Sequence, residues 1–192
     1  MTTPDRILAF DDGAQWEGWL ERNHATAPDA WLQIAKSGST VGGISIGEAL
    51  DGALCFGWID GQRRSRDGES YLQRYSPRRP TSSWSKINVD KFEALVSAGR
   101  VRPAGIAAAE QAKADGRWSA AYESQASAQT PADLLAALSA EPAAAAAFES
   151  LNRSARYAVI LPLLKARSAA RRAALVARVV EGLAARTRPT KG

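Results

Sequence analysis

The chain has 192 residues, of which 45% are hydrophobic and 23% charged, as is typical of a globular protein that buries its own core. Its net charge is +5, which favours anionic partners. The chain has one cysteine, Cys55, and one histidine, His24. This composition excludes an intramolecular disulfide, a cysteine-rich zinc site and a cluster of histidine metal ligands. We therefore expect no metal and no cofactor.

The apolar segments of the sequence are short. None approaches the roughly 20 residues that a transmembrane helix requires, and the run at 7–10 is too brief for the apolar core of a signal peptide. A single unpaired cysteine is also typical of a reducing compartment. We therefore expect a cytoplasmic protein without a membrane span.

The first part of the chain predicts short strands that alternate with helices. Apolar residues recurring every three or four positions indicate helices, and an aspartate or serine just before such a run is suited to cap it. The expected elements are a strand at 7–10, a helix capped by Asp11 or Asp12 and ending near 23–24, a strand at 30–36, a loop at 37–43 and a helix from about Ser45. All six tryptophans precede residue 119, so this part is rich in aromatic residues.

A β-hairpin is expected next. The pair Asp67-Gly68 is typical of a two-residue type I′ turn, in which both central residues need a positive φ. Counting outward from this turn pairs Arg64 with Tyr71 and Asp60 with Tyr75. Side chains alternate along a strand, so six residues are predicted to share one polar, aromatic and partly cationic face: Asp60, Gln62, Arg64, Tyr71, Gln73 and Tyr75.

Helices account for the remainder of the chain. The expected helices are one that ends near 99, one at 103–114 with Pro103 in its first turn, one that starts near 131, one opened by Pro142, one at 154–166 and one at 168–185. Pro162 lies inside the fifth of these and is expected to kink or split it.

The stretch at 124–129, made of Ser, Gln and Ala, is the expected joint between two parts. We predict an α+β domain at 1–128 and a helical subdomain at 129–192. The fold class is therefore α+β, with a small antiparallel sheet whose β-hairpin packs on helices, followed by an all-helical C-terminal subdomain.

The basic charge is concentrated in two segments. Eight lysines and arginines lie between residues 63 and 91 against three acidic residues, and eight more lie between 165 and 191 against one. In the first segment arginines alternate with aromatic and hydroxyl side chains, a combination that binds carboxylates or phosphates and stacks on planar groups. We predict a ligand-binding face for an anionic small molecule or peptide, made of Trp58, Asp60, Arg64, Tyr71, Arg74, Tyr75, Arg78, Trp84 and Lys86.

Other functions are compatible with the same residues. The basic hairpin and the arginine-rich last helix could bind the phosphates of a nucleic acid. Asp60 could act as the general acid or base of an enzyme, which requires an enclosed pocket around its carboxylate. The hairpin could also be merely solvated, with arginine stems packed over tryptophan and tyrosine rings. Non-catalytic binding is the leading hypothesis.

Several motifs extend over nearly the whole chain: ALDGALCFGWIDG at 49–61, QRYSPRRP at 73–80, SWSKIN at 83–88, RPAG at 102–105, DGRW at 115–118 and NRSARY at 152–157. In these segments the chain resembles the bacteriocin-protection, YdeI/OmpD-associated family. The resemblance implies an α+β body with a small helical C-terminal domain. It also implies a link to envelope stress or to resistance against bacteriocins and antimicrobial peptides, and it implies no particular reaction.

Overall fold

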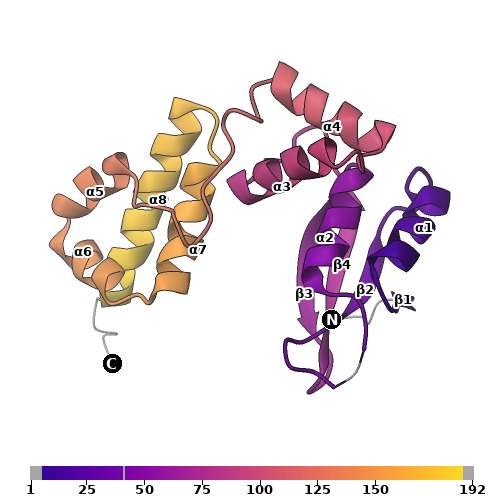
Figure 1. Ribbon diagram of the computed structural model, residues 1–192. Coiled ribbons are helices and arrows are strands. Elements are labelled where there is room, and N and C mark those ends of the chain that lie inside the picture. The colour runs from indigo at the N-terminus through magenta and orange to yellow at the C-terminus, as the bar shows by residue number, and fades with distance from the viewer. Residues whose placement is uncertain (1–5, 41, 188–192) are drawn as a thin grey trace. The chain divides into compact units, whose positions relative to one another are not determined.

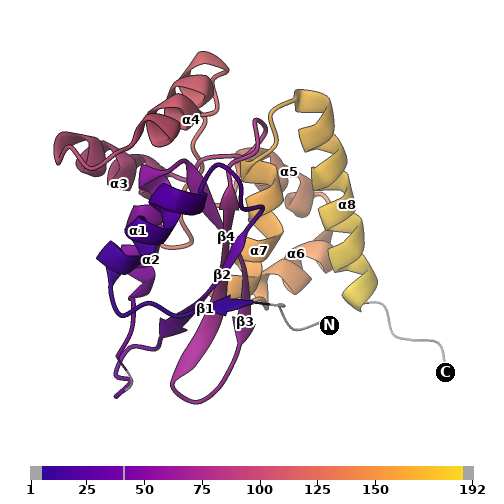
Figure 2. The same cartoon turned by 90° about the vertical axis from the view of Figure 1, so that its right-hand side faces the viewer.

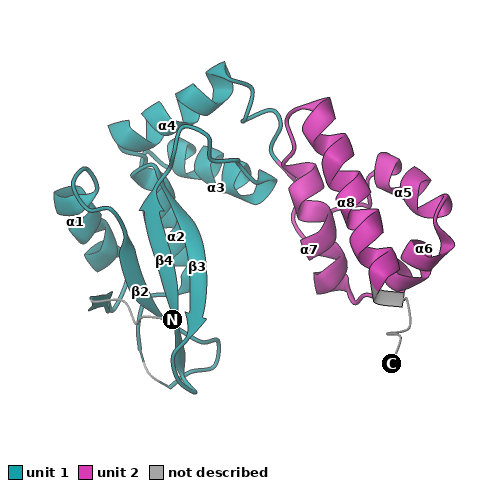
Figure 3. Cartoon of the chain, turned by 180° about the vertical axis from the view of Figure 1, so that it is seen from behind, with its two compact units in different colours: residues 1–121 teal, residues 122–192 magenta. Residues whose placement is uncertain are grey.

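The computed structural model describes residues 6–40 and 42–187, and the chain divides into two compact units, Met1–Ala121 and Tyr122–Gly192 (Figure 3). Unit 1 contains β1 (Ile7–Leu8), α1 (Gly13–Asn23), β2 (Ala30–Ala35), α2 (Ile46–Cys55), β3 (Trp58–Ser65), β4 (Ser70–Pro77), α3 (Lys86–Ser97) and α4 (Pro103–Ala114) (Figure 1). Unit 2 contains α5 (Ala132–Ser139), α6 (Pro142–Glu149), α7 (Arg153–Leu164) and α8 (Ala169–Thr187). The α+β class with a helical C-terminal region is confirmed, and a domain boundary at 128/129 stays a prediction.

The four strands form one sheet in the order β1-β2-β4-β3. The sheet is antiparallel except at the two-residue strand β1, which runs parallel to β2. A parallel pair needs a crossover between its strands, and α1 supplies it. The hairpin strand β3 forms one edge of the sheet, so its outer backbone groups have no neighbouring strand in this sheet.

Helices α1 and α2 lie on the same face of the sheet (Figure 2). Asp12 caps α1 by accepting a hydrogen bond from the backbone N–H of Gln15. Ser45 caps α2 in a reciprocal capping box with Glu48. Both helices therefore begin where the sequence predicted, at residues whose side chains satisfy backbone N–H groups that the first helical turn leaves free.

Aromatic side chains fill the space between these helices and the sheet. Trp16, Trp58 and Tyr75 are fully buried there. The indole N–H of Trp16 donates to the carbonyl of Ala49 at 3.0 Å, which ties α1 to α2. Cys55 is buried in the same core, and burial raises the pKa of its thiol to about 11. The thiol is therefore neutral at physiological pH, as expected of a structural cysteine.

Unit 2 is built around α8, which packs against α5, α6 and α7. Its buried apolar core contains Leu134, Leu138, Phe148, Ile160, Leu163, Val176 and Leu183. Arg172 on α8 donates to Asp133 on α5 at 2.9 Å, and this hydrogen bond lowers the pKa of the Asp133 carboxyl. Of the two effects expected of Pro162, a kink or a split, the split does not occur: α7 continues to Leu164, because a proline in the last turn removes only one intrahelical hydrogen bond. Over the described ranges, no helix is long and apolar enough to cross a bilayer.

The turn of the hairpin differs from the expected type I′ turn. Neither Asp67 nor Gly68 has a positive φ, and four residues at 66–69 connect the strands. The carboxylate of Asp67 accepts hydrogen bonds from the backbone N–H groups of Glu69 (3.0 Å) and Ser70 (2.6 Å). The aspartate side chain thus organises a wider loop, which is an alternative open to any Asp at a turn.

The wider loop changes the register. Arg64 lies opposite Leu72 and Ser65 opposite Tyr71, one position away from the predicted pairing. A β-bulge between Asp60 and Arg63 restores the predicted pairing of Asp60 with Tyr75. Arg63 therefore shares a face with Tyr71, Gln73 and Tyr75, whereas Arg64 lies on the opposite face, so the predicted single face is wrong at residue 64.

Gly105 is required where α4 crosses the end of α2. A Cβ atom at this position would lie 2.4 Å from the carbonyl oxygen of Cys55 and 2.9 Å from that of Leu54. We predict that Gly105→Ala lowers the free energy of unfolding of unit 1 by about 1–3 kcal/mol, because two rigid backbone segments must separate.

Gly47→Ala is the matched control, because a Cβ there would meet only the hydroxyl oxygen of Ser45, at an ordinary distance of 3.8 Å. It should leave stability unchanged or raise it by up to about 1 kcal/mol through helix propensity. Urea unfolding followed by tryptophan fluorescence measures both variants. Equal midpoints for Gly105→Ala and Gly47→Ala would contradict the proposed close helix crossing.

Candidate functional site

The side-chain amide of Gln73 organises the bulge in β3. Gln73 is only 3% exposed, and its Nε2 lies 3.1 Å from the carbonyl oxygen of Gly61 and 3.3 Å from that of Gln62, the two residues within the bulge. It also lies 3.2 Å from the carbonyl of Arg74 on its own strand. A bulge leaves backbone groups without a cross-strand partner, and this buried amide supplies the missing donor.

The side-chain amide of Gln73 also orients Arg63. Oε1 of Gln73 accepts a hydrogen bond from Nε of Arg63 at 3.2 Å. The guanidinium then lies over the ring of Tyr71, with its carbon 4.4 Å from the ring centroid. Arg63 is exposed, and within the described residues no carboxylate lies at ion-pair distance from it. A stacked guanidinium retains in-plane N–H groups that can bind an oxyanion.

The opposite face of the sheet carries a second group of arginines. The guanidinium of Arg64 lies 4.6 Å from the ring of Trp31. Arg74 forms an ion pair with Asp29, with 2.6 Å between Nη2 and Oδ2. The predicted ligand-binding residues are thus divided between two faces: Arg64 and Arg74 lie on this face, whereas Asp60, Tyr71 and Tyr75 lie on the other.

Three predicted ligand-binding residues lie in the core. Trp58 and Tyr75 are buried between the sheet and its helices, and Trp84 is buried against Phe92. Burial strongly raises the pKa of the Tyr75 phenol, which therefore stays neutral at physiological pH. These three side chains therefore lie beneath the exposed surface of unit 1 and cannot contact a ligand on it directly.

Asp60 and Tyr71 lie with Arg63 on the same sheet face at the exposed hairpin edge. Neither cavity described in the structure includes Asp60 in its wall. Across residues 6–40 and 42–187, no three histidine, cysteine, aspartate or glutamate side chains gather in a way that could hold a metal ion.

A separate cluster of two arginines, Arg78 and Arg117, surrounds Trp84 and the segment before α3. The guanidinium of Arg78 lies 3.6 Å from the Trp84 ring and donates to the carbonyl of Ser83 at 3.3 Å. Arg117, only 3% exposed, donates through Nε to both carboxylate oxygens of Asp115 at 2.8 Å. It also donates through Nη1 to the carbonyl of Ser82 at 2.9 Å. Two guanidinium groups thus hold the segment that leads into α3.

Lys86 is the first residue of α3 and is exposed at the N-terminus of that helix. Two residues of these clusters were missed as candidates from the sequence. Arg63 was missed because the assumed turn placed Arg64 in its position. Arg117 was missed although it lies in the DGRW motif, where an arginine directly before a tryptophan was the available signal.

The role of Gln73 is testable by Gln73→Leu. Leucine fills a similar volume but leaves the buried carbonyls of the bulge without donors, so we predict a loss of about 2–3 kcal/mol in the free energy of unfolding. Gln33→Leu is the matched control, because that side chain is half-buried and only accepts one hydrogen bond, from Arg66. Urea denaturation measures both, and similar midpoint shifts would contradict a special role for Gln73.

Comparison with known proteins identifies both units. Residues 8–108, more than half of the chain, match the family described as a domain of unknown function (DUF8412). Residues 127–186 match the family described as bacteriocin-protection, YdeI or OmpD-associated. No curated protein and no solved structure matches the chain. The chain therefore belongs to the DUF8412 family, and its C-terminal region matches the bacteriocin-protection, YdeI or OmpD-associated family, to which the resemblance pointed and in which the motif at 152–157 lies.

Proposed function

We propose that this protein is a non-catalytic binding protein for an anionic small molecule or peptide, and that Arg63 at the edge of the hairpin is its main contact. The observation that carries the proposal is the exposed guanidinium of Arg63, which is stacked on Tyr71 and held by the buried amide of Gln73. A pre-oriented guanidinium loses less conformational entropy when it binds a carboxylate or phosphate than a freely moving lysine does.

The electrostatics of the hairpin support an anionic ligand. The segment from residue 63 to 91 carries eight basic and three acidic residues. Of the arginines, Arg74 has a carboxylate partner in Asp29, whereas Arg63 has only the neutral partners Gln73 and Tyr71 among the residues described. An exposed guanidinium with only neutral partners favours an anionic ligand over a cationic one.

The other predicted ligand-binding residues have distinct parts in this proposal. Asp60 and Tyr71 lie on the same sheet face as Arg63. Arg64 and Arg78 stack on Trp31 and Trp84, Arg74 is paired with Asp29, and Lys86 is exposed at the start of α3, so these four are secondary contacts in the proposal. Trp58, Tyr75 and Trp84 act only as the buried support of this surface.

The proposed chemistry also bears on the bacteriocin-protection description of the C-terminal family. Many antimicrobial peptides are cationic, and a basic surface does not favour binding them directly. A protective role would instead act through an anionic molecule that the protein binds inside the cell. We propose that the protein acts in the cytoplasm, because a single, unpaired and buried cysteine is typical of proteins in a reducing compartment.

The test uses a fluorescein-labelled hexaglutamate peptide and the full-length protein, with binding followed by fluorescence anisotropy. We expect saturable binding at about 25 mM NaCl that weakens strongly at about 200 mM, because the contacts are exposed ion pairs. Arg63→Ala should weaken binding by about tenfold, the usual contribution of one charge-assisted contact. Tyr71→Leu, which removes the supporting ring, should cause a smaller loss.

Arg22→Ala is the charge-matched control, because Arg22 is exposed on α1 outside the hairpin. It should change the affinity by less than about twofold. A hexalysine peptide should not bind. Equal losses of hexaglutamate affinity in Arg63→Ala and Arg22→Ala would show that binding depends only on net charge, and would overturn the proposed site. A single-stranded oligonucleotide that binds much more tightly than hexaglutamate would favour the nucleic-acid hypothesis instead.

A further inference from the structure

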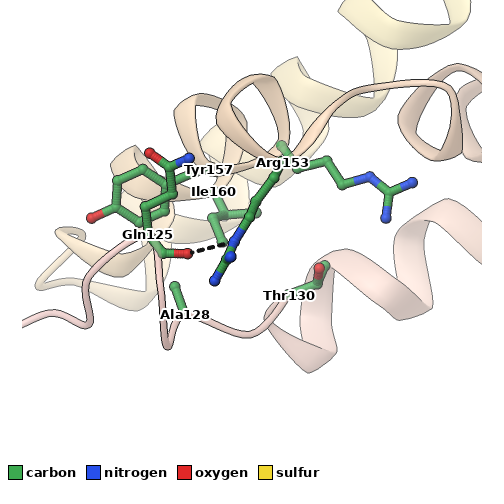
Figure 4. A pocket seen from close by; sticks show the side chains of 7 residues that line it. Gln125, Ala128, Thr130, Arg153, Tyr157 and Ile160 are labelled. Carbon is green, nitrogen blue, oxygen red and sulfur yellow. Dashed lines mark hydrogen bonds between the residues drawn. The ribbon is translucent and has the colours of Figure 1, made fainter.

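A second cationic site lies within unit 2, in a cavity of about 270 Å³ between the segment that precedes α5 and the first turns of α7 (Figure 4). Its wall includes the charged residues Arg153 and Arg156, the hydroxyl residue Thr130, and the apolar surfaces of Tyr157 and Ile160. None of these residues belongs to the hairpin surface, so this site is independent of the function proposed above.

The two guanidinium groups in the wall are held by neutral partners. Arg153 donates through Nε to the carbonyl of Gln125 at 3.3 Å, the bond marked in Figure 4, and through Nη2 to the carbonyl of Ala126 at 2.6 Å. Arg156 donates through Nε to the carbonyl of Leu151 at 2.9 Å and through Nη2 to that of Glu149. These carbonyls fix both guanidinium groups without neutralising them.

The charge of the cavity is therefore uncompensated. In the described part of the chain, neither arginine lies at ion-pair distance from a carboxylate, and no aspartate or glutamate lines the cavity. Each guanidinium also keeps its Nη1 group free of the backbone contacts given above. Two positive charges without carboxylate partners in the wall of a partly apolar cavity favour the binding of an oxyanion.

The dimensions and the apolar wall restrict the ligand. A cavity of this volume lies near the lower end of the range for small-molecule sites, so it suits a ligand of about the size of a single amino acid. The hydroxyl of Tyr157 donates to the carbonyl of Glu123 at 2.9 Å, which holds its ring in the wall next to Ile160. Apolar atoms of the ligand can pack there while its anionic group meets the arginines.

We infer that this cavity binds a small oxyanion, either a carboxylate on an apolar body or a phosphate group. The chemistry common to both is a planar or tetrahedral set of oxygens that accepts hydrogen bonds from a guanidinium group held in the cavity wall. The C-terminal domain would then be a ligand-binding module in its own right.

The test is a two-dimensional ¹H–¹⁵N NMR titration of the full-length protein at constant ionic strength, with sodium benzoate and inorganic phosphate in separate arms. We expect saturable shifts confined to the amides at 125–130 and 152–157. Saturation by benzoate alone assigns the carboxylate with an apolar body, and saturation by phosphate alone assigns the phosphate. Shifts that do not saturate, or that spread over all basic segments, would overturn the site.

Thr130→Glu and Thr130→Gln form the matched pair of variants, because they have nearly the same size and leave both arginines in place. Glu adds a carboxylate that pairs with the guanidinium groups, so it should weaken binding at least tenfold, about 1.4 kcal/mol. Gln should change it by less than about twofold. Equal affinities in the two variants would show that the cavity does not hold the anion.

Two further variants separate this site from general charge effects and from the hairpin. Arg178→Ala removes one positive charge from an exposed position on α8, outside the cavity, and should leave the titration unchanged. Arg63→Ala should also leave these shifts unchanged while weakening hexaglutamate binding, so that failure of one proposal is distinguishable from failure of the other. A loss of the shifts in Arg178→Ala equal to that in Thr130→Glu would overturn the inference.

Discussion

The buried amide of Gln73 is the constraint on which the arrangement of the basic hairpin depends. Its Nε2 reaches the carbonyls of both bulge residues, and its Oε1 receives Nε of Arg63. An extra residue in a strand is tolerated only where its backbone groups find other partners, and here one side chain provides them. Because of the bulge, Arg63 rather than Arg64 shares a sheet face with Asp60 and Tyr75. The position of Arg63 on this face is therefore coupled to one hydrogen-bonded amide in the interior of unit 1.

Unit 1 repeatedly places an arginine on an aromatic ring. Arg63 covers Tyr71, Arg64 covers Trp31 and Arg78 covers Trp84. Each stack covers apolar ring surface, and in Arg63 the charge stays within reach of solvent or of a ligand. The interpretation of the hairpin as arginine stems over aromatic rings and its interpretation as a binding surface are therefore compatible. The same contacts that cover the rings also orient the guanidinium groups.

Much of this arrangement was predictable from the sequence, and the remainder depends on a turn with more than one possible geometry and on contacts between distant residues. The caps at Asp12 and Ser45 are local signals, and the helices begin there. The register of the hairpin was not predictable, because an Asp-Gly pair suits more than one turn and the deciding contacts of Asp67 are with Glu69 and Ser70. The cavity of unit 2 was also missed, because its walls come from segments about 25 residues apart whose approach no local pattern reports.

The two edges of the sheet are protected against pairing with another chain in different ways. On one side β1 is only two residues long, too short to template an added strand. On the other side β3 is eight residues long, but it is interrupted by a bulge and carries neighbouring arginines. Like charges on the β3 strands of two molecules repel each other, so self-association along this edge is disfavoured. The arginines that we propose as anion contacts thus also disfavour the joining of separate copies into a continuous intermolecular sheet.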